Sequence, residues 1–260
     1  MDCFKLIWRE GSIKGYGAVY PLDETHFRLN LMVHSDCRRI GIGTALFQLV
    51  EEESRRLGCS SLQARTLEGE GGGLEFAIRN GFQEVHRMRG MILRAADFQF
   101  ENWVGLGESL RGQDFSVTDL AEEYRSGERS IEKLIELHRA AVEDWVRIDP
   151  TVRPNTGTGH LTAFFTGAKK PERVSIIKLG ERYAGYTCSD PENLIGTAVH
   201  PEFRNRGVAT YLKACDLKKS FDRGAQEIES ATANPAMIRV NQKLGYRPNG
   251  LCEIRLFKSL

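Results

Sequence analysis

One pattern of eleven residues occurs twice in this chain, and the repeat limits the fold more than any other feature. Val33–Gly43 reads VHSDCRRIGIG and Val199–Ala209 reads VHPEFRNRGVA, an offset of 166 residues. Further along the chain, Asn80-Gly81-Phe82 matches Leu244-Gly245-Tyr246 at an offset of 164. A register kept over most of the first 82 residues indicates duplication of a folding unit. The chain is therefore predicted to hold a first and a second copy, in which Arg38 matches Arg204, Gly41 matches Gly207, Thr44 matches Thr210 and Gly58 matches Gly224.

Each copy is predicted to run strand, strand, strand, helix, strand, helix. Gly58 and Gly224 suit the left-handed conformation that follows a helix, and Asn234 before Pro235 is a typical helix start. In the first copy, strands are expected at Phe4–Arg9, Ile13–Tyr20, Leu29–Val33 and Leu62–Arg65, and the first helix at Gly43–Leu57. In the second copy, strands are expected at Val174–Leu179, Tyr183–Ser189, Leu194–Val199 and Glu227–Ala231, and the first helix at Ala209–Arg223.

The copies differ at their fronts. The second copy has about 85 residues before its motif, with a strand at Phe115–Thr118 and an amphipathic helix at Ser130–Trp145. A Gly/Thr/Pro-rich loop at Thr151–Thr158 and a short helix near Leu161–Thr166 follow. We therefore predict an incomplete domain over residues 1–96, a complete one over 113–260, and a connection over 97–112 that is packed by Phe98, Phe100 and Trp103.

Composition narrows the class of protein. With 36 Lys and Arg against 35 Asp and Glu, the formal net charge of +1 argues against nucleic-acid and anionic-membrane partners. The six cysteines form no CxxC pair, so neither a zinc site nor a disulfide framework is expected. No apolar run approaches the ~20 residues of a membrane span, and the N-terminal MDCFKLIWRE is no secretory signal. We expect a globular cytoplasmic protein.

The repeated Arg-x-x-Gly-x-Gly/Ala motif lies between a strand and a helix. Unpaired N–H groups of such a turn and the helix dipole together attract a pyrophosphate, and small residues leave it room. A lone match would be better explained as an ordinary turn, but two registered copies favour anion binding. A P-loop is excluded because no Gly-Lys-Ser/Thr follows, and a dinucleotide-binding Rossmann motif because Gly-x-Gly-x-x-Gly is absent.

Val-x-Pro-x-x-Arg-x-x-Gly-x-Ala, followed by a helix, a strand, an Asn-capped helix and Leu-Gly-Tyr, resembles the GNAT family of N-acetyltransferases. The resemblance implies an α/β (α+β) fold of tandem GNAT domains, each a mixed, mostly antiparallel sheet with helices on both faces. It implies acetyl-CoA as co-substrate, and it implies that the strand ending at Val199 splays from its neighbour and pairs with the pantetheine arm. No metal is expected. The implied coenzyme-binding residues are Val199, His200, Arg204, Asn205, Arg206, Gly207, Val208, Ala209, Thr210, Asn234 and Asn241, with a possible second site at Val33, Arg38, Arg39, Ile40, Gly41, Ile42, Gly43 and Thr44.

Family membership would imply direct attack of a primary amine on the thioester, with a backbone N–H near Val199–His200 for the oxyanion. The tyrosine that usually protonates the thiolate is replaced by Asn241, and by Ala77 in the first copy. Asn241 is therefore either a hydrogen-bonding group of the site or a solvent-facing residue. Thr197 and Ser230 are further candidates, Tyr183, Tyr186 and Cys188 lie on a strand that should meet the acceptor, and Glu143, Asp144, Asp149 and His160 should line the acceptor wall.

The first copy is expected to be non-catalytic, because Glu68–Gly73 replaces the asparagine cap and the acceptor-side helices are missing. The leading interpretation is an enzyme that acetylates the amine of a small molecule, as a monomer or homodimer. Two alternatives stay open: acetylation of a protein N-terminus or lysine, and a non-catalytic acyl-CoA sensor.

Overall fold

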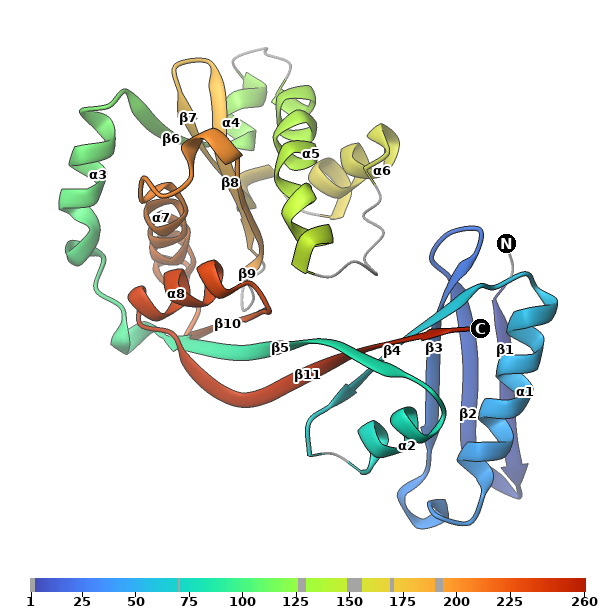
Figure 1. The fold of residues 1–260 in the computed structure, drawn as a ribbon. Coiled ribbons are helices and arrows are strands. Elements are labelled where there is room, and N and C mark those ends of the chain that lie inside the picture. Colours follow the sequence, from blue (N-terminus) through green and yellow to red (C-terminus); the bar gives the residue numbers. More distant parts are fainter. Residues whose placement is uncertain (1–2, 70, 126–129, 149–155, 169–170, 190–193) are drawn as a thin grey trace. The chain divides into compact units, whose positions relative to one another are not determined.

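The computed structural model describes residues 3–69, 71–125, 130–148, 156–168, 171–189 and 194–260. The chain forms two compact units (Figure 1). The first unit is Met1–Met88 with Leu251–Leu260, and the second is Arg89–Gly250. The units therefore cut the chain differently from the sequence repeat, because the last residues of the second copy belong to the first unit.

The first unit is a sheet with helices on one face. Strands β1 (Phe4–Glu10), β2 (Ser12–Pro21) and β3 (His26–Val33) pair antiparallel in sequence order. Helix α1 (Ile42–Arg56) packs on them, and β4 (Ser61–Leu67), α2 (Gly73–Arg79) and β5 (Gln83–Arg94) follow. Glycines on β2 let the sheet and α1 approach closely: a Cβ at Gly17 would stand 3.0 Å from Val50 of α1.

The second unit is three-layered around the sheet β6 (Phe115–Asp119), β7 (Val174–Leu179), β8 (Arg182–Ser189) and β9 (Leu194–Val199). Figure 1 shows α5 (Ser130–Ile148) on one side of these strands and α3 (Val104–Arg111) and α7 (Val208–Asp222) on the other. Helices α4 (Leu120–Arg125) and α6 (Thr158–Ala163) join α5, and a π-helical turn at Phe164–Ala168 continues α6. Each face buries its own apolar cluster, so both are closed to water.

Strand β10 (Glu227–Thr232), helix α8 (Pro235–Lys243) and strand β11 (Arg247–Ser259) complete the chain. Asn234 caps α8, accepting a hydrogen bond from the Ala236 N–H at 2.9 Å on its Oδ1, as predicted. Gly58 and Gly224 have φ of +80° and +96°, which confirms the predicted helix ends.

The final strands are exchanged between the units. β11 begins in the second unit, but its residues Glu253–Ser259 pair antiparallel with β4 of the first. β5 begins in the first unit, but Arg89–Arg94 pair antiparallel with β10 of the second. The order of hydrogen-bonded neighbours is accordingly β1-β2-β3-β4-β11-β5-β10. These two long strands were not predicted from the sequence.

The connection 97–112 is packed, as predicted: Phe98, Phe100 and Trp103 lie against the apolar cluster of β10, α7 and α8. Its helix α3 was not predicted. Within the described residues, no helix is both long and apolar enough to cross a bilayer.

Candidate functional site

The turn between β9 and α7 has an unusual main-chain conformation. Arg204 Nε donates a hydrogen bond to the Val199 carbonyl at 3.2 Å, which ties the turn back to the end of the strand. Asn205 and Gly207 have φ of +61° and +83°. Such alternation of left-handed and right-handed residues turns successive N–H groups toward one concavity.

Helix α7 opens toward the same concavity. Its first i→i−4 hydrogen bond runs from the Tyr211 N–H to the Gly207 carbonyl at 2.9 Å. The N–H groups of Val208, Ala209 and Thr210 precede this bond, and the positive end of the helix dipole lies with them. We call this turn, Arg204–Thr210, the second nest.

The first copy builds the same nest over Arg38–Thr44. Arg38 Nε donates to the Val33 carbonyl at 3.1 Å, and Arg39 and Gly41 have φ of +66° and +96°. The first bond of α1 runs from the Ala45 N–H to the Gly41 carbonyl at 3.0 Å. The predicted duplication thus extends to individual hydrogen bonds.

The two nests differ in what surrounds them. A Cβ at Gly207 would stand 2.8 Å from Leu106 of α3, whereas one at Gly41 would meet nothing within 4 Å. The side chains of Arg38 and Arg39 instead lie against Gly71 and Gly72, where no Cβ could stand without displacing them. Each nest is therefore supported by a different part of the chain.

The exposed backbone edge of β9 lies beside the second nest. The His200 N–H donates to the Ala184 carbonyl at 2.9 Å, and the next pair toward the strand interior is Gly185 with Val199. Antiparallel pairs alternate between hydrogen-bonded and non-bonded, so the N–H groups of Val199 and Thr197 point away from β8. His200 is therefore wrong as a source of an oxyanion N–H, because Ala184 already uses that group.

β9 and β10 splay apart, as expected. They belong to different sheets within the second unit, and β9 has a bulge at its start, between its pairings with Ser189 and Cys188. In the first unit, β3 and β4 pair in parallel only from His26 to Arg28, while both strands continue beyond. Both copies thus have a strand edge that opens next to a nest.

Asn241 lies buried beside this splay. Its side chain is 0 % exposed, so the solvent-facing alternative is wrong. Its Oδ1 accepts from Lys213 Nζ at 2.5 Å, and its Nδ2 donates to Ser230 Oγ at 3.3 Å. Ser230 is thus a partner of Asn241, and Lys213 is a second, buried partner that was not predicted from the sequence.

Two ionisable residues of α7, Lys213 and Asp216, are buried on the same face of the helix. Burial lowers the pKa of Lys213 to about 7, with the nearby Asp216 carboxylate opposing the shift. Burial raises the pKa of Asp216 to about 6, although Ser189 and Ser175 donate to its carboxylate, the latter at 3.1 Å. The spacing of Lys213 and Asp216, i and i+3, places both on one face of the helix. This spacing does not predict burial, because charged residues usually indicate an exposed face.

These geometries agree with the comparisons with known proteins. The sequence model of the Acetyltransferase (GNAT) family matches residues 2–82 and again residues 134–246. The chain belongs to this family. It is a GNAT-type acyltransferase with two GNAT regions in tandem.

Solved structures show the same fold. A GCN5-related N-acetyltransferase from Sphaerobacter thermophilus is 15 % identical, with a TM-score of 0.74 over 96 % of this chain and 78 % of that one. A tandem GNAT protein from the clavulanic acid biosynthesis pathway is 20 % identical, with a TM-score of 0.70 over 99 % and 83 %. A GCN5-related N-acetyltransferase from Kribbella flavida is 12 % identical, with a TM-score of 0.59 over 96 % of this chain and 89 % of that one. No curated protein matches the sequence.

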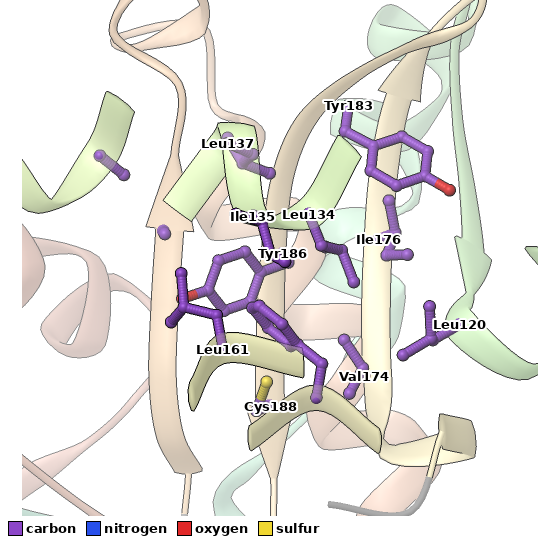
Figure 2. Close-up of a cluster of buried hydrophobic side chains, with 13 residues drawn as sticks. Leu120, Leu134, Ile135, Leu137, Leu161, Val174, Ile176, Tyr183, Tyr186 and Cys188 are labelled. Carbon is purple, nitrogen blue, oxygen red and sulfur yellow. The ribbon is translucent and has the colours of Figure 1, made fainter. Parts of the chain in front are cut away.

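The remaining site residues that were predicted on strands lie on β9 and on β8. Thr197 Oγ1 lies 2.9 Å from Thr187 Oγ1 of β8. Tyr183, Tyr186 and Cys188 are buried in the cluster that α5 and α6 cover, and Figure 2 shows Tyr186 between the other two.

Two polar groups within that cluster were not predicted. His138 Nδ1 of α5 lies 2.7 Å from Tyr186 Oη, and burial together with His160 lowers the pKa of His138. Glu123 of α4 accepts from Tyr183 Oη at 2.7 Å and from Lys178 Nζ at 2.9 Å. Glu143 and His160 are exposed. Asp149 and the side chain of Asp144 lie outside the described residues, as do residues 151–155 of the predicted loop.

The first GNAT copy lacks the polar groups of the second. Gly72 precedes α2 in place of a capping asparagine, and its φ is +73°. Ala77 and Phe47 occupy the positions of Asn241 and Lys213, and both are buried in the apolar cluster of the first unit.

Proposed function

We propose that the second copy transfers the acetyl group of acetyl-CoA to a primary amine of a small molecule. The observation that carries this proposal is the second nest beside the splayed edge of β9. A nest supplies N–H groups for a pyrophosphate, and a free strand edge supplies them for the amides of a pantetheine arm.

In this proposal the pyrophosphate binds Arg204–Thr210, with His200, Asn205 and Arg206 forming the wall of the nest. The pantetheine arm pairs with the backbone of Val199 and Thr197, and Asn234 and Asn241 approach it from α8. This proposal includes all the coenzyme-binding residues predicted from the sequence in the second copy, and it leaves out the His200 N–H as an oxyanion donor.

The chain contributes to the transfer by stabilising developing charge and by bordering the acceptor. A neutral amine attacks the thioester carbon, a C–N bond forms and the C–S bond breaks. The oxyanion that develops is stabilised by an N–H group aimed at it. Val199 and Thr197 supply two such groups on β9, one for the oxyanion and one for a carbonyl of the pantetheine arm. Helices α4, α5 and α6 border the side from which the amine enters.

The first copy is proposed to be non-catalytic, since it has Ala77 and Phe47 in place of Asn241 and Lys213. Its nest over Val33 and Arg38–Thr44 can still hold an anion, so a second coenzyme site there is part of the proposal.

Release of free thiol tests the activity. The purified chain is mixed with acetyl-CoA and separate panels of small amines, peptides with free N-termini and lysine peptides. Thiol release that depends on a small amine supports the proposal. Release only with peptides supports a protein acetyltransferase, and tight binding of acetyl-CoA without release by any panel supports a sensor.

The duplication offers a matched pair of variants for the nests. Ala209→Asp and Gly43→Asp place a carboxylate at the same position in the two copies. Repulsion of the pyrophosphate should weaken coenzyme binding at the altered nest by about 10-fold or more. Titration calorimetry counts the sites, and thiol release reports the activity. Loss of transfer in Gly43→Asp alone would move catalysis to the first copy.

A further inference from the structure

Lys213 is the most unusual buried group of the second unit. Its side chain is 0 % exposed, and lysine is almost never buried without a carboxylate partner. Its ammonium has three donors, and the structure gives it two acceptors: Asn241 Oδ1 at 2.5 Å and Met237 Sδ at 3.9 Å. The ammonium also lies 5.5 Å from the centre of the Tyr246 ring. Neither of the acceptors given for the ammonium is a carboxylate.

Packing alone does not require a lysine here. The matching residue of the first copy is Phe47, which is 2 % exposed and contacts the rings of Phe76 and Phe82. The same fold therefore holds an apolar side chain at this position. The lysine occurs in the copy that has Asn241, whereas the first copy has Ala77 at the matching position.

Lys213 lies where the thiol end of a bound coenzyme is proposed. It follows Gly207 by six residues, so its Cα lies about 9 Å along the helix axis from the second nest. Its partner Asn241 hydrogen-bonds to Ser230 of β10, one of the two splayed strands. Asn241 also stands at the position where the GNAT pattern has a tyrosine.

We propose that the Lys213 ammonium, oriented by Asn241, donates the proton to the departing thiolate. This inference rests on the proposed function. The amine nitrogen bonds to the acetyl carbon, the C–S bond breaks with its electron pair on sulfur, and Lys213 transfers one proton to that sulfur. The nitrogen loses its extra proton to solvent, and neutral Lys213 regains a proton once CoA has left the site.

The surroundings of Lys213 suit this role. Asp216 of α7 is the charged group near it, and the other described groups facing it are neutral: Asn241 and Met237 of α8, Tyr246, and Ser230 and Met91 beyond Asn241. Burial lowers the pKa of Lys213 to about 7. A thiol ordinarily titrates near pH 8.5, so the proton transfer to sulfur is favourable by about 1.5 pKa units.

Three variants of the full chain test the role. Lys213→Met removes the proton, Lys213→Arg keeps a charge that cannot be given up, and Lys218→Met is an exposed control on the same helix. General acid catalysis is worth 10²–10⁴-fold. We expect kcat to fall about 100-fold in both Lys213 variants with an unchanged KM for acetyl-CoA, and no change in Lys218→Met. The fall of kcat at alkaline pH that deprotonation of Lys213 causes should be absent in both Lys213 variants. Full activity in Lys213→Arg would overturn the proton-donor role, because charge alone would suffice.

A second readout does not depend on turnover. The ¹³Cε resonance of Lys213, assigned by its loss in Lys213→Met, is titrated with and without CoA. A pKa near neutrality that shifts on binding CoA but not desulfo-CoA supports contact with the sulfur. A pKa indifferent to the sulfur overturns the inference while leaving the proposed function intact. If the wild-type chain does not bind acetyl-CoA at all, the proposed function itself fails.

Discussion

Gly41 and Gly207 have the same left-handed backbone, yet the two copies use this residue differently. At Gly41 the absence of a Cβ matters only for the conformation, since the space around it is open. At Gly207 it matters for packing as well, because Leu106 of α3 occupies the space. A single motif residue can thus satisfy two physical demands in one copy and one demand in the other.

This difference is testable. Gly41→Ala should cost about 1 kcal/mol, the strain of a left-handed alanine. Gly207→Ala should cost about 1–3 kcal/mol more, because Leu106 must move as well. Urea unfolding of the two variants measures both values. Equal losses would show that α3 yields without cost, and a Leu106→Ala background should remove the difference.

Lys213 should make stability depend on pH. Its pKa is lowered to about 7, so between pH 7 and its ordinary value of about 10.4 the unfolded chain binds a proton that the folded chain lacks. Stability therefore rises with pH across this window. Asp216 has the opposite effect on stability at lower pH. Its pKa is raised to about 6, so between about pH 4 and 6 the folded chain binds a proton that the unfolded chain lacks, and stability falls as pH rises.

Lys213→Met should accordingly be more stable than wild type at pH 7, by about 1–3 kcal/mol, and lose this advantage by pH 10. Urea unfolding at pH 7, 8.5 and 10 measures the difference, with Lys218→Met as control. A variant that is less stable at every pH would identify Lys213 as a structural residue.

At the scale of elements, the exchanged strands decide which sheet each segment completes. Ile254 and Leu256 of β11 are 0 % and 2 % exposed in the apolar cluster of the first unit. Leu93 of β5 is 1 % exposed in a cluster of the second unit. Each unit therefore depends on a strand that starts in the other.

Ile254→Ala should consequently destabilise the first unit, although the residue belongs to the second copy in sequence. Loss of a buried isoleucine side chain costs about 2–5 kcal/mol. Hydrogen exchange should speed up at β4 amides such as Ala64 more than at β8 amides such as Thr187. Leu251→Ala, at a position 52 % exposed, is the matched control on the same strand. Equal acceleration at β4 and β8 would contradict the assignment of β11 to the first unit.

At the scale of the whole molecule, the exchange makes the two copies one folding system. A fragment of residues 113–260, the predicted second domain, lacks the β5 segment that pairs with β10 and the Phe98 and Trp103 side chains packed against its core. We expect it to be unfolded or aggregated by circular dichroism and gel filtration. Co-expression with residues 1–112 should restore a soluble complex. A fragment that is stable alone would show that the exchanged strand is dispensable.

The sequence by itself determined the repeated part of the molecule. Gly58, Gly224 and Asn234 end or begin helices through their own backbone and side-chain preferences. The Arg204-x-x-Gly207 motif shapes the nest within seven residues. Such signals act over one turn of chain, so they can be identified without tertiary contacts. The family resemblance rested on the same residues.

Only the tertiary structure decided the rest. β5 and β11 pair across long sequence separations, and the pattern of a strand does not say which partner it joins. The burial of Lys213 and Asn241 depends on α7, α8 and β10 meeting, which no local spacing encodes. The availability of the Val199 N–H, in contrast to that of His200, follows from the register of β9 on β8, and register is a property of two strands together.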